Sequence, residues 1–99
     1  MDLIERNIDK ISDLCSKHRV GKLFAFGSVL TNNFKSDSDI DLIVDFKKID
    51  LYDYADNYFD LKFSLENLFN REVDLLEDKA IKNPYLRKSI DSTKQLIYG

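Results

Sequence analysis

Cysteine is scarce in this chain, and its scarcity excludes two kinds of structure. The single cysteine, Cys15, cannot form an internal disulfide or a paired-cysteine metal site. It falls on the apolar side of a helical pattern, where a cysteine usually packs in the core. The sequence therefore predicts a packed core thiol rather than a reactive one.

Long apolar runs and an excess of basic residues are also missing. The N-terminal segment MDLIERNIDK carries charges where a signal peptide would be hydrophobic, and no run of 18 apolar residues follows it. We therefore expect a cytoplasmic protein without membrane contact. Lysine and arginine total 15 against 18 acidic residues, a net charge of −3, which gives no basic footprint for direct nucleic-acid binding.

Glycine and proline are rare, and each falls at the edge of a predicted element. The chain has three glycines and one proline, and no linker, repeat or low-complexity segment interrupts its predicted elements. A chain of 99 residues can bury one modest core. We expect residues 1–99 to form a single domain.

The spacing of the apolar residues predicts alternating helices and strands. The first expected helix covers 3–18, with Ile4, Ile8, Ile11 and Cys15 on one face, and a short helix at 29–33 follows, capped by Ser28. A long helix capped by Asp50 has a core stripe from Leu51 to Leu68. The last helix is capped by Asn83 and begins at Pro84, with Leu86, Ile90 and Ile97 inward. The expected strands are 22–26, 39–45 and 72–76. This order predicts an α+β fold in which helices pack on a small three-stranded mixed sheet.

Two aspartates interrupt the apolar strand at 39–45, whose sequence is DIDLIVD. Asp39 and Asp41 project to the same side because alternate residues of a strand share a face, and their Cα atoms are about 6.5 Å apart. Asp74 stands in the middle of the third strand and faces the same side if the two strands are neighbours. The sequence therefore predicts three carboxylates around one point.

Carboxylates so close together repel one another, and burial adds a desolvation cost. A divalent cation removes the conflict, and oxygen ligands without histidine or cysteine suit Mg²⁺, which commonly binds a few carboxylates together with substrate phosphates. Gly27 and Ser28 precede the short helix, where a glycine lets a phosphate approach the backbone and a hydroxyl and free N–H groups can bind it.

The motif GS, ten residues, then DxD, with a later carboxylate on a following strand, resembles the signature of the DNA polymerase β-like nucleotidyltransferase superfamily, in its minimal nucleotidyltransferase branch. The resemblance covers nearly the whole chain and implies the polymerase β-like fold. It implies that Asp39 and Asp41 hold two Mg²⁺ ions, that Gly27 and Ser28 bind the terminal phosphates of ATP, and that Asp74 shares a metal and helps to deprotonate the attacking hydroxyl.

The loop after this motif departs from the family pattern. Many members carry an arginine and a second glycine soon after the GS, whereas this chain reads GSVLTNNFKSDSD. Lys35 is the only cation in the loop, and a lysine does not reproduce the bidentate contact of a guanidinium. We expect Lys35, with Gly27 and Ser28, to bind the nucleotide, or Arg71 to substitute for the missing arginine.

The acceptor and the partner follow from the resemblance alone. In this branch the minimal domain is often paired with a HEPN-domain ribonuclease toxin and acts as its antitoxin, in some cases by attaching AMP to a toxin tyrosine. Three alternatives stay open: an inactive antitoxin that neutralises its partner by contact, transfer to a small molecule such as an aminoglycoside, and a purely structural role for the acids. Self-association is also open.

Two further features invite a structural and a functional interpretation. Tyr52, Phe59 and Phe63 cluster about 100° from the leucine stripe of the long helix. They form either a partner surface or packing beneath the first or last helix. His18, the only histidine, lies at a helix end, where a structural role beside the helix dipole is expected.

Overall fold

The computed structural model describes residues 2–32 and 34–99 and shows helices alternating with strands. The helices are α1 (Asp2–Arg6), α2 (Ile8–Lys17), α3 (Leu51–Phe69) and α4 (Pro84–Thr93), with short 3-10 helices η1 (Gly27–Leu30) and η2 (Asp78–Ala80). The strands are β1 (Val20–Phe26), β2 (Ile40–Phe46), β3 (Val73–Glu77) and β4 (Gln95–Tyr98).

The strands form one mixed sheet in the order β3, β2, β1, β4. β2 runs antiparallel to β1 and parallel to β3, and β4 pairs antiparallel with the other edge of β1. The predicted α+β class is confirmed, although the sheet has four strands instead of three. The prediction that the last helix continues to Ile97 is wrong, because α4 ends at Thr93 and Lys94 adopts an extended backbone (φ −58°, ψ 147°) that directs the next residues onto β1.

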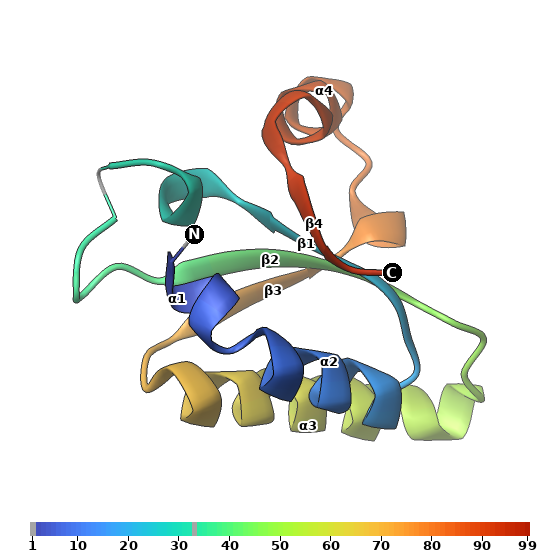
Figure 1. Cartoon of the computed structure of the whole chain (residues 1–99). Helices are drawn as coiled ribbons and strands as arrows, with labels where there is room; N and C mark the ends of the chain where they lie inside the picture. The colour runs from blue at the N-terminus through green and yellow to red at the C-terminus, as the bar shows by residue number, and fades with distance from the viewer. Residues whose placement is uncertain (1, 33) are drawn as a thin grey trace.

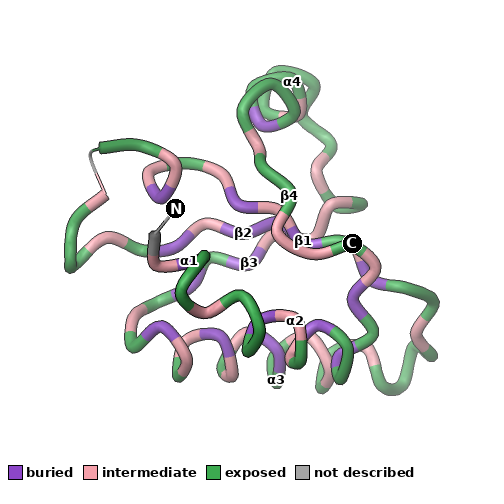
Figure 2. The backbone as a smooth tube through the Cα atoms, viewed as in Figure 1, coloured by how far each residue is buried: buried purple, intermediate pink, exposed green. Residues whose placement is uncertain are grey.

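The two faces of the sheet are covered differently (Figure 1). α2 and α3 lie side by side against one face, which we call the covered face, and α4 stands over part of the other, which we call the open face. The covered face and its helices form the core, which includes Ile4, Ile11, Cys15, Leu23, Ala25, Ile40, Leu42, Val44, Leu61, Leu65, Val73 and Leu75. Figure 2 shows this buried layer along the strands and along the inner sides of α2 and α3. The expected core position of Cys15 is confirmed.

The capping residues of α3 and α4 are those that the sequence predicts. The Asp50 carboxylate accepts a hydrogen bond from the backbone N–H of Tyr52, and the Asn83 side chain accepts from the N–H groups of Tyr85 and Leu86. Each cap satisfies donors that the first turn of a helix leaves without partners. α3 ends at Asn70, whose left-handed backbone (φ 55°) turns the chain towards β3.

Several predicted helix boundaries are wrong. The helix expected over 3–18 is broken at Asn7 (φ −113°, ψ 13°), whose side chain donates to the Leu3 carbonyl, so Ile8 becomes exposed. Leu51 and Leu86 are exposed as well, because each lies in the first turn of its helix, away from the packed side. The helix expected at 29–33 is the 3-10 helix η1, which has no side-chain cap from Ser28, and residue 33 lies outside the described residues.

His18 links α2 to α3. Its side chain is buried, with Nδ1 2.6 Å from the Leu14 carbonyl oxygen and Nε2 2.6 Å from Asp60 Oδ2. Its backbone carbonyl accepts a hydrogen bond from the Asn57 side chain at 2.7 Å. His18 therefore has the structural role expected at a helix end, and it also fastens two helices together.

The outer edge of β3 is covered by side chains of α3. The Glu66 carboxylate accepts a hydrogen bond from the backbone N–H of Val73 at 3.1 Å, and the Tyr58 hydroxyl donates to the Leu75 carbonyl. An edge strand leaves such groups unpaired unless side chains satisfy them. α3 thus holds β3, and with it Asp74, against β2. Among the described helices, none is long and apolar enough to span a bilayer.

Candidate active site

The open face of β2 and β3 brings two of the predicted acids together. The parallel register pairs Asp41 directly with Asp74, so both side chains project from neighbouring positions on one face. Asp39 precedes β2 and is exposed, as is Asp74, whereas Asp41 is half-buried. The inference that the two strands are neighbours is therefore correct, and the sheet register gives Asp74 its place beside Asp41.

The carboxylate of Asp41 is electrostatically stressed. Burial raises its pKa, and the negative charges of Asp74 and then Asp39 raise it further. Within residues 2–32 and 34–99, no ion pair compensates the charge of any of the three acids. The site thus has an unbalanced negative charge that a cation would relieve.

Gly27 places the serine turn directly against this charge. β1 ends at Phe26, which pairs with Asp41, and Gly27 then takes a left-handed backbone (φ 74°). A Cβ atom at position 27 would lie only 2.5 Å from Asp41 Oδ2, so the carboxylate occupies the space that any other residue would fill. The Ser28 carbonyl closes the turn by accepting hydrogen bonds from the Thr31 backbone N–H and hydroxyl, both at 2.9 Å.

Two cavities flank the acids. One, of about 310 Å³, is lined by Asp39, Asp74, Val73, Glu72 and, from α3, Lys62 and Glu66. The other, of about 410 Å³, is lined by Gly27, Leu30, Thr31, Thr93 and Gln95. Asp41 lies between them, because it pairs with Asp74 on one side and contacts Gly27 on the other. The arrangement offers room for two reactants that meet at the carboxylates.

The carboxylates fit Mg²⁺ by their chemistry but do not form a complete metal cage. In the described part of the chain, no group of three or more acidic, histidine or cysteine side chains is close enough to hold a metal ion by itself. Mg²⁺ usually takes one or two carboxylates and completes its shell with water and substrate phosphates. Oxygen donors, the raised pKa of Asp41 and the adjoining cavity are consistent with such a shared site.

The two cations predicted to replace the missing arginine have other positions. Arg71 Nη1 donates to the carbonyl oxygens of Lys35 and Ser38, each at 3.0 Å, and its guanidinium carbon lies 4.7 Å from the centre of the Phe34 ring. Arg71 therefore holds the loop that leads into Asp39. Lys35 lines a separate cavity of about 450 Å³ with Arg6 and Arg71, and neither Lys35 nor Arg71 lines the cavity at Gly27.

The aromatic residues of α3 are exposed and do not pack beneath another helix. Phe59 and Phe63 stack with ring centres 6.1 Å apart, and they are 50% and 56% exposed. Tyr52 is almost fully exposed. Packing beneath the first or last helix is thereby excluded for these three side chains, and the partner surface stays a prediction.

Comparison with known proteins identifies the family. Residues 9–99 match the family model described as polymerase beta, nucleotidyltransferase. The chain belongs to this family. A relative from Methanocaldococcus jannaschii that bears the name of a protein adenylyltransferase is 37% identical over 94% of this chain and 98% of its own length. The resemblance of the GS and DxD motifs is thus confirmed, and the chain is a nucleotidyltransferase of the minimal kind.

Solved structures show the same architecture. A structure described as a minimal nucleotidyltransferase is 28% identical, covers 96% of this chain and 95% of its own, and superposes with a TM-score of 0.77. A complex of a tri-AMPylated HEPN toxin of Shewanella oneidensis with MNT antitoxin contains a chain that is 19% identical, with coverages of 97% and 72% and a TM-score of 0.66. At 19% identity, this second likeness shows only that the two chains share the same fold.

Sequence reasoning placed the acids and the glycine but missed how their surroundings are held. Arg71 contacts carbonyl groups more than thirty positions earlier in the chain, and no local pattern identifies such partners. Lys94 appeared to lie inside a helix, whereas it begins the passage from α4 to β4 beside the cavity at Gly27. A four-residue strand next to a helix gives too short a signal to reveal that change of direction.

Proposed function

We propose that this nucleotidyltransferase transfers AMP from ATP to a protein hydroxyl, a tyrosine of a HEPN-domain toxin, and thereby acts as its antitoxin. The observation that carries the proposal is the pairing of Asp41 with Asp74 directly opposite Gly27. The relative named as a protein adenylyltransferase supports adenylyl transfer to protein, and the AMPylated HEPN toxin in complex with MNT antitoxin supports the partner class.

Each residue has a defined part in this reaction. Gly27 and Ser28 admit the terminal phosphates of ATP to the backbone beside Asp41. Asp39 and Asp41 would hold two Mg²⁺ ions, with Asp74 sharing one, and these ions supply charge neutralisation for the triphosphate and its leaving group. Asp74 accepts the proton of the acceptor hydroxyl. That oxygen then bonds to the α-phosphorus as the bond to pyrophosphate breaks, which yields AMP-protein and pyrophosphate.

The test is transfer of label from ATP to the product of the neighbouring gene, which the proposal expects to be a HEPN-domain protein. Purified chain, Mg²⁺ and ATP labelled in the α-phosphate should label that protein, and Asp39→Asn or Asp41→Asn should reduce the rate on the order of 100-fold or more. Asp37→Asn is the matched control, because Asp37 is exposed in the same loop and should leave the rate unchanged. Labelling that survives both site changes would contradict the proposal.

Neutralisation by contact alone is the second candidate function. It is favoured by the loop after Ser28, which lacks arginine and places Lys35 away from the cavity at Gly27. The exposed Phe59 and Phe63 provide an apolar contact surface for a partner. If contact alone suffices, the Asp39→Asn, Asp41→Asn double variant will still rescue growth of cells that express the toxin, and under adenylylation it will not.

A further inference from the structure

Lys94 stands where α4 ends and β4 begins, on the open face of the sheet. Its backbone N–H donates to the Ile90 carbonyl at 2.8 Å and closes the last turn of α4. Its Nζ lies 4.4 Å from the centre of the Phe24 ring. Phe24 pairs with Ile43, and Phe26 pairs with Asp41, so the lysine head lies over the same face as the Asp41 carboxylate.

The cavity next to Lys94 adjoins the acids but has no charged lining. Its five lining residues are uncharged, and Thr93 and Gln95, the chain neighbours of Lys94, form one side of it. Gly27 forms the other side and contacts Asp41. Phe24 and Phe26 are two residues apart on β1, so their Cα atoms are about 6.5 Å apart, a distance within the reach of a flexible lysine side chain. The Lys94 side chain is therefore long enough to extend from Phe24 towards this cavity.

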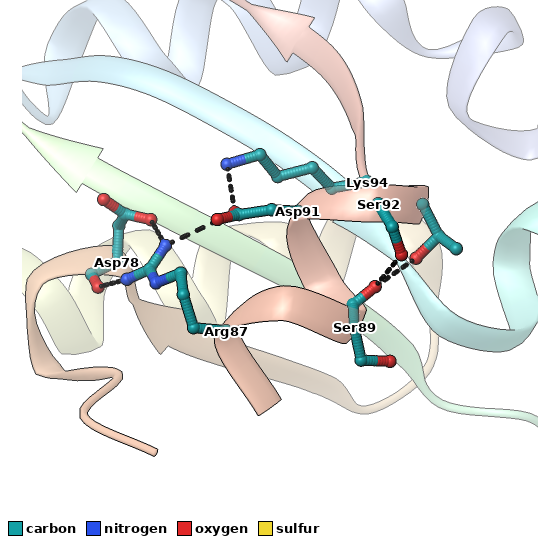
Figure 3. Close-up of polar contacts among 7 residues, drawn as sticks. Asp78, Arg87, Ser89, Asp91, Ser92 and Lys94 are labelled. Atoms are coloured by element: carbon teal, nitrogen blue, oxygen red, sulfur yellow. Dashed lines mark hydrogen bonds and ion pairs between the residues drawn. The ribbon is translucent and has the colours of Figure 1, made fainter. Parts of the chain in front are cut away.

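The ion pairs around Lys94 allow it to change partner (Figure 3). Its Nζ lies 2.8 Å from Asp91 Oδ1, and Arg87 Nη1 lies 3.5 Å from the same oxygen. Arg87 is fixed in place by Asp78, at 2.8 Å. When Lys94 leaves Asp91, the Asp91 carboxylate keeps the Arg87 guanidinium as its ion-pair partner, so the movement leaves no carboxylate unpaired.

We propose that the Lys94 ammonium group binds the triphosphate of the nucleotide held at Gly27 and so supplies the cation that the loop after Ser28 lacks. The inference deepens the proposed function and rests on it. A triphosphate next to Asp39, Asp41 and Asp74 meets an excess of negative charge. Lys94, whose chain neighbours line the cavity at Gly27, offsets this repulsion with its positive charge. The substrate class is a nucleoside triphosphate. A nucleoside monophosphate has only one phosphate, which lies at the three acids, so it gains little from Lys94.

The test compares the binding of AMP-PNP and AMP by calorimetry in the presence of Mg²⁺. Lys94→Gln should weaken AMP-PNP binding about tenfold, which corresponds to about 1.4 kcal/mol, and leave AMP binding unchanged. Lys94→Arg should restore most of the affinity. The matched control is Lys88→Gln, an exposed lysine of the same helix, which should behave as the parent.

Asp91→Asn gives an independent measurement if Lys94→Gln folds poorly. Removal of the Asp91 charge releases Lys94 while Arg87 stays paired with Asp78, so AMP-PNP binding should tighten two- to threefold. Equal affinities of the parent and both variants for AMP-PNP would overturn the inference, as would equal weakening of AMP-PNP and AMP by Lys94→Gln. A parent chain that fails to bind AMP-PNP would overturn the proposed function as well, which separates the two failures.

Discussion

The two faces of β2 have opposite demands although they alternate along the same seven residues. On the covered face, Ile40, Leu42 and Val44 are fully enclosed by α2, α3 and the neighbouring strands. On the open face, Asp41 is half-buried beside Asp74, with a raised pKa and no ion-pair partner among the described side chains. Neighbouring residues of β2 therefore serve different purposes: those on the covered face stabilise the core, and Asp41 on the open face belongs to the candidate site. Each face can therefore be altered without the other.

The largest expected effect is on the covered face. Leu42→Ala leaves a cavity between Ala25 and Leu75, its partners on β1 and β3, and should lower the free energy of unfolding by about 2–5 kcal/mol. Urea denaturation measures the loss. The matched control is Leu96→Ala on β4, where the side chain is half-exposed and the change should stay within about 0.5 kcal/mol. Similar losses for the two variants would show that the covered face does not dominate stability.

The second effect tests how the open face is held. Arg71→Lys loses the paired contacts to the Lys35 and Ser38 carbonyls, so Asp39 is displaced and the rate constant of pyrophosphate release should fall on the order of tenfold. Because Arg71 does not line the cavity at Gly27, KM for ATP should change little.

Arg19→Lys is the control for this prediction. Arg19 also clamps a carbonyl group, that of Lys48, with hydrogen bonds of 2.9 and 3.1 Å, but it does so away from the acids. Its replacement should leave the rate constant unchanged. A fall in rate for both variants, in proportion to their loss of stability, would refute a positioning role for Arg71.

The smallest effect is a gain of stability from the open face. The native pKa of Asp41 is raised, so the native state binds this proton more tightly than the unfolded chain does. The stability that this proton contributes is present at low pH and is lost as pH rises through the native pKa. Asp41→Asn removes this loss, so the metal-free variant should melt above the metal-free parent at pH 7, and the difference should close towards pH 3. Thermal melts across this range measure it, and a variant that melts below the parent at pH 7 would contradict the stressed carboxylate.

Much of this site follows from the sequence because it is written in local patterns. The alternation in DIDLIVD fixes which face Asp39 and Asp41 occupy, and Asp50 and Asn83 mark the two helix starts. The register that sets Asp74 beside Asp41 depends on the pairing of two strands joined by α3. From the sequence, this position of Asp74 could be predicted only if the two strands were assumed to be neighbours. The end of α4 and the loop contacts of Arg71 depend on distant partners, so they required the structure.

The contact between Gly27 and Asp41 has an evolutionary consequence. A side chain at position 27 would both strain a left-handed backbone and displace the carboxylate, so the residue that position 27 can carry depends on the residue at position 41. A lineage that abandons catalysis no longer needs the carboxylate at position 41, whereas the left-handed backbone still favours glycine at position 27. Loss of the aspartate should therefore come first, and change at the glycine should follow more slowly.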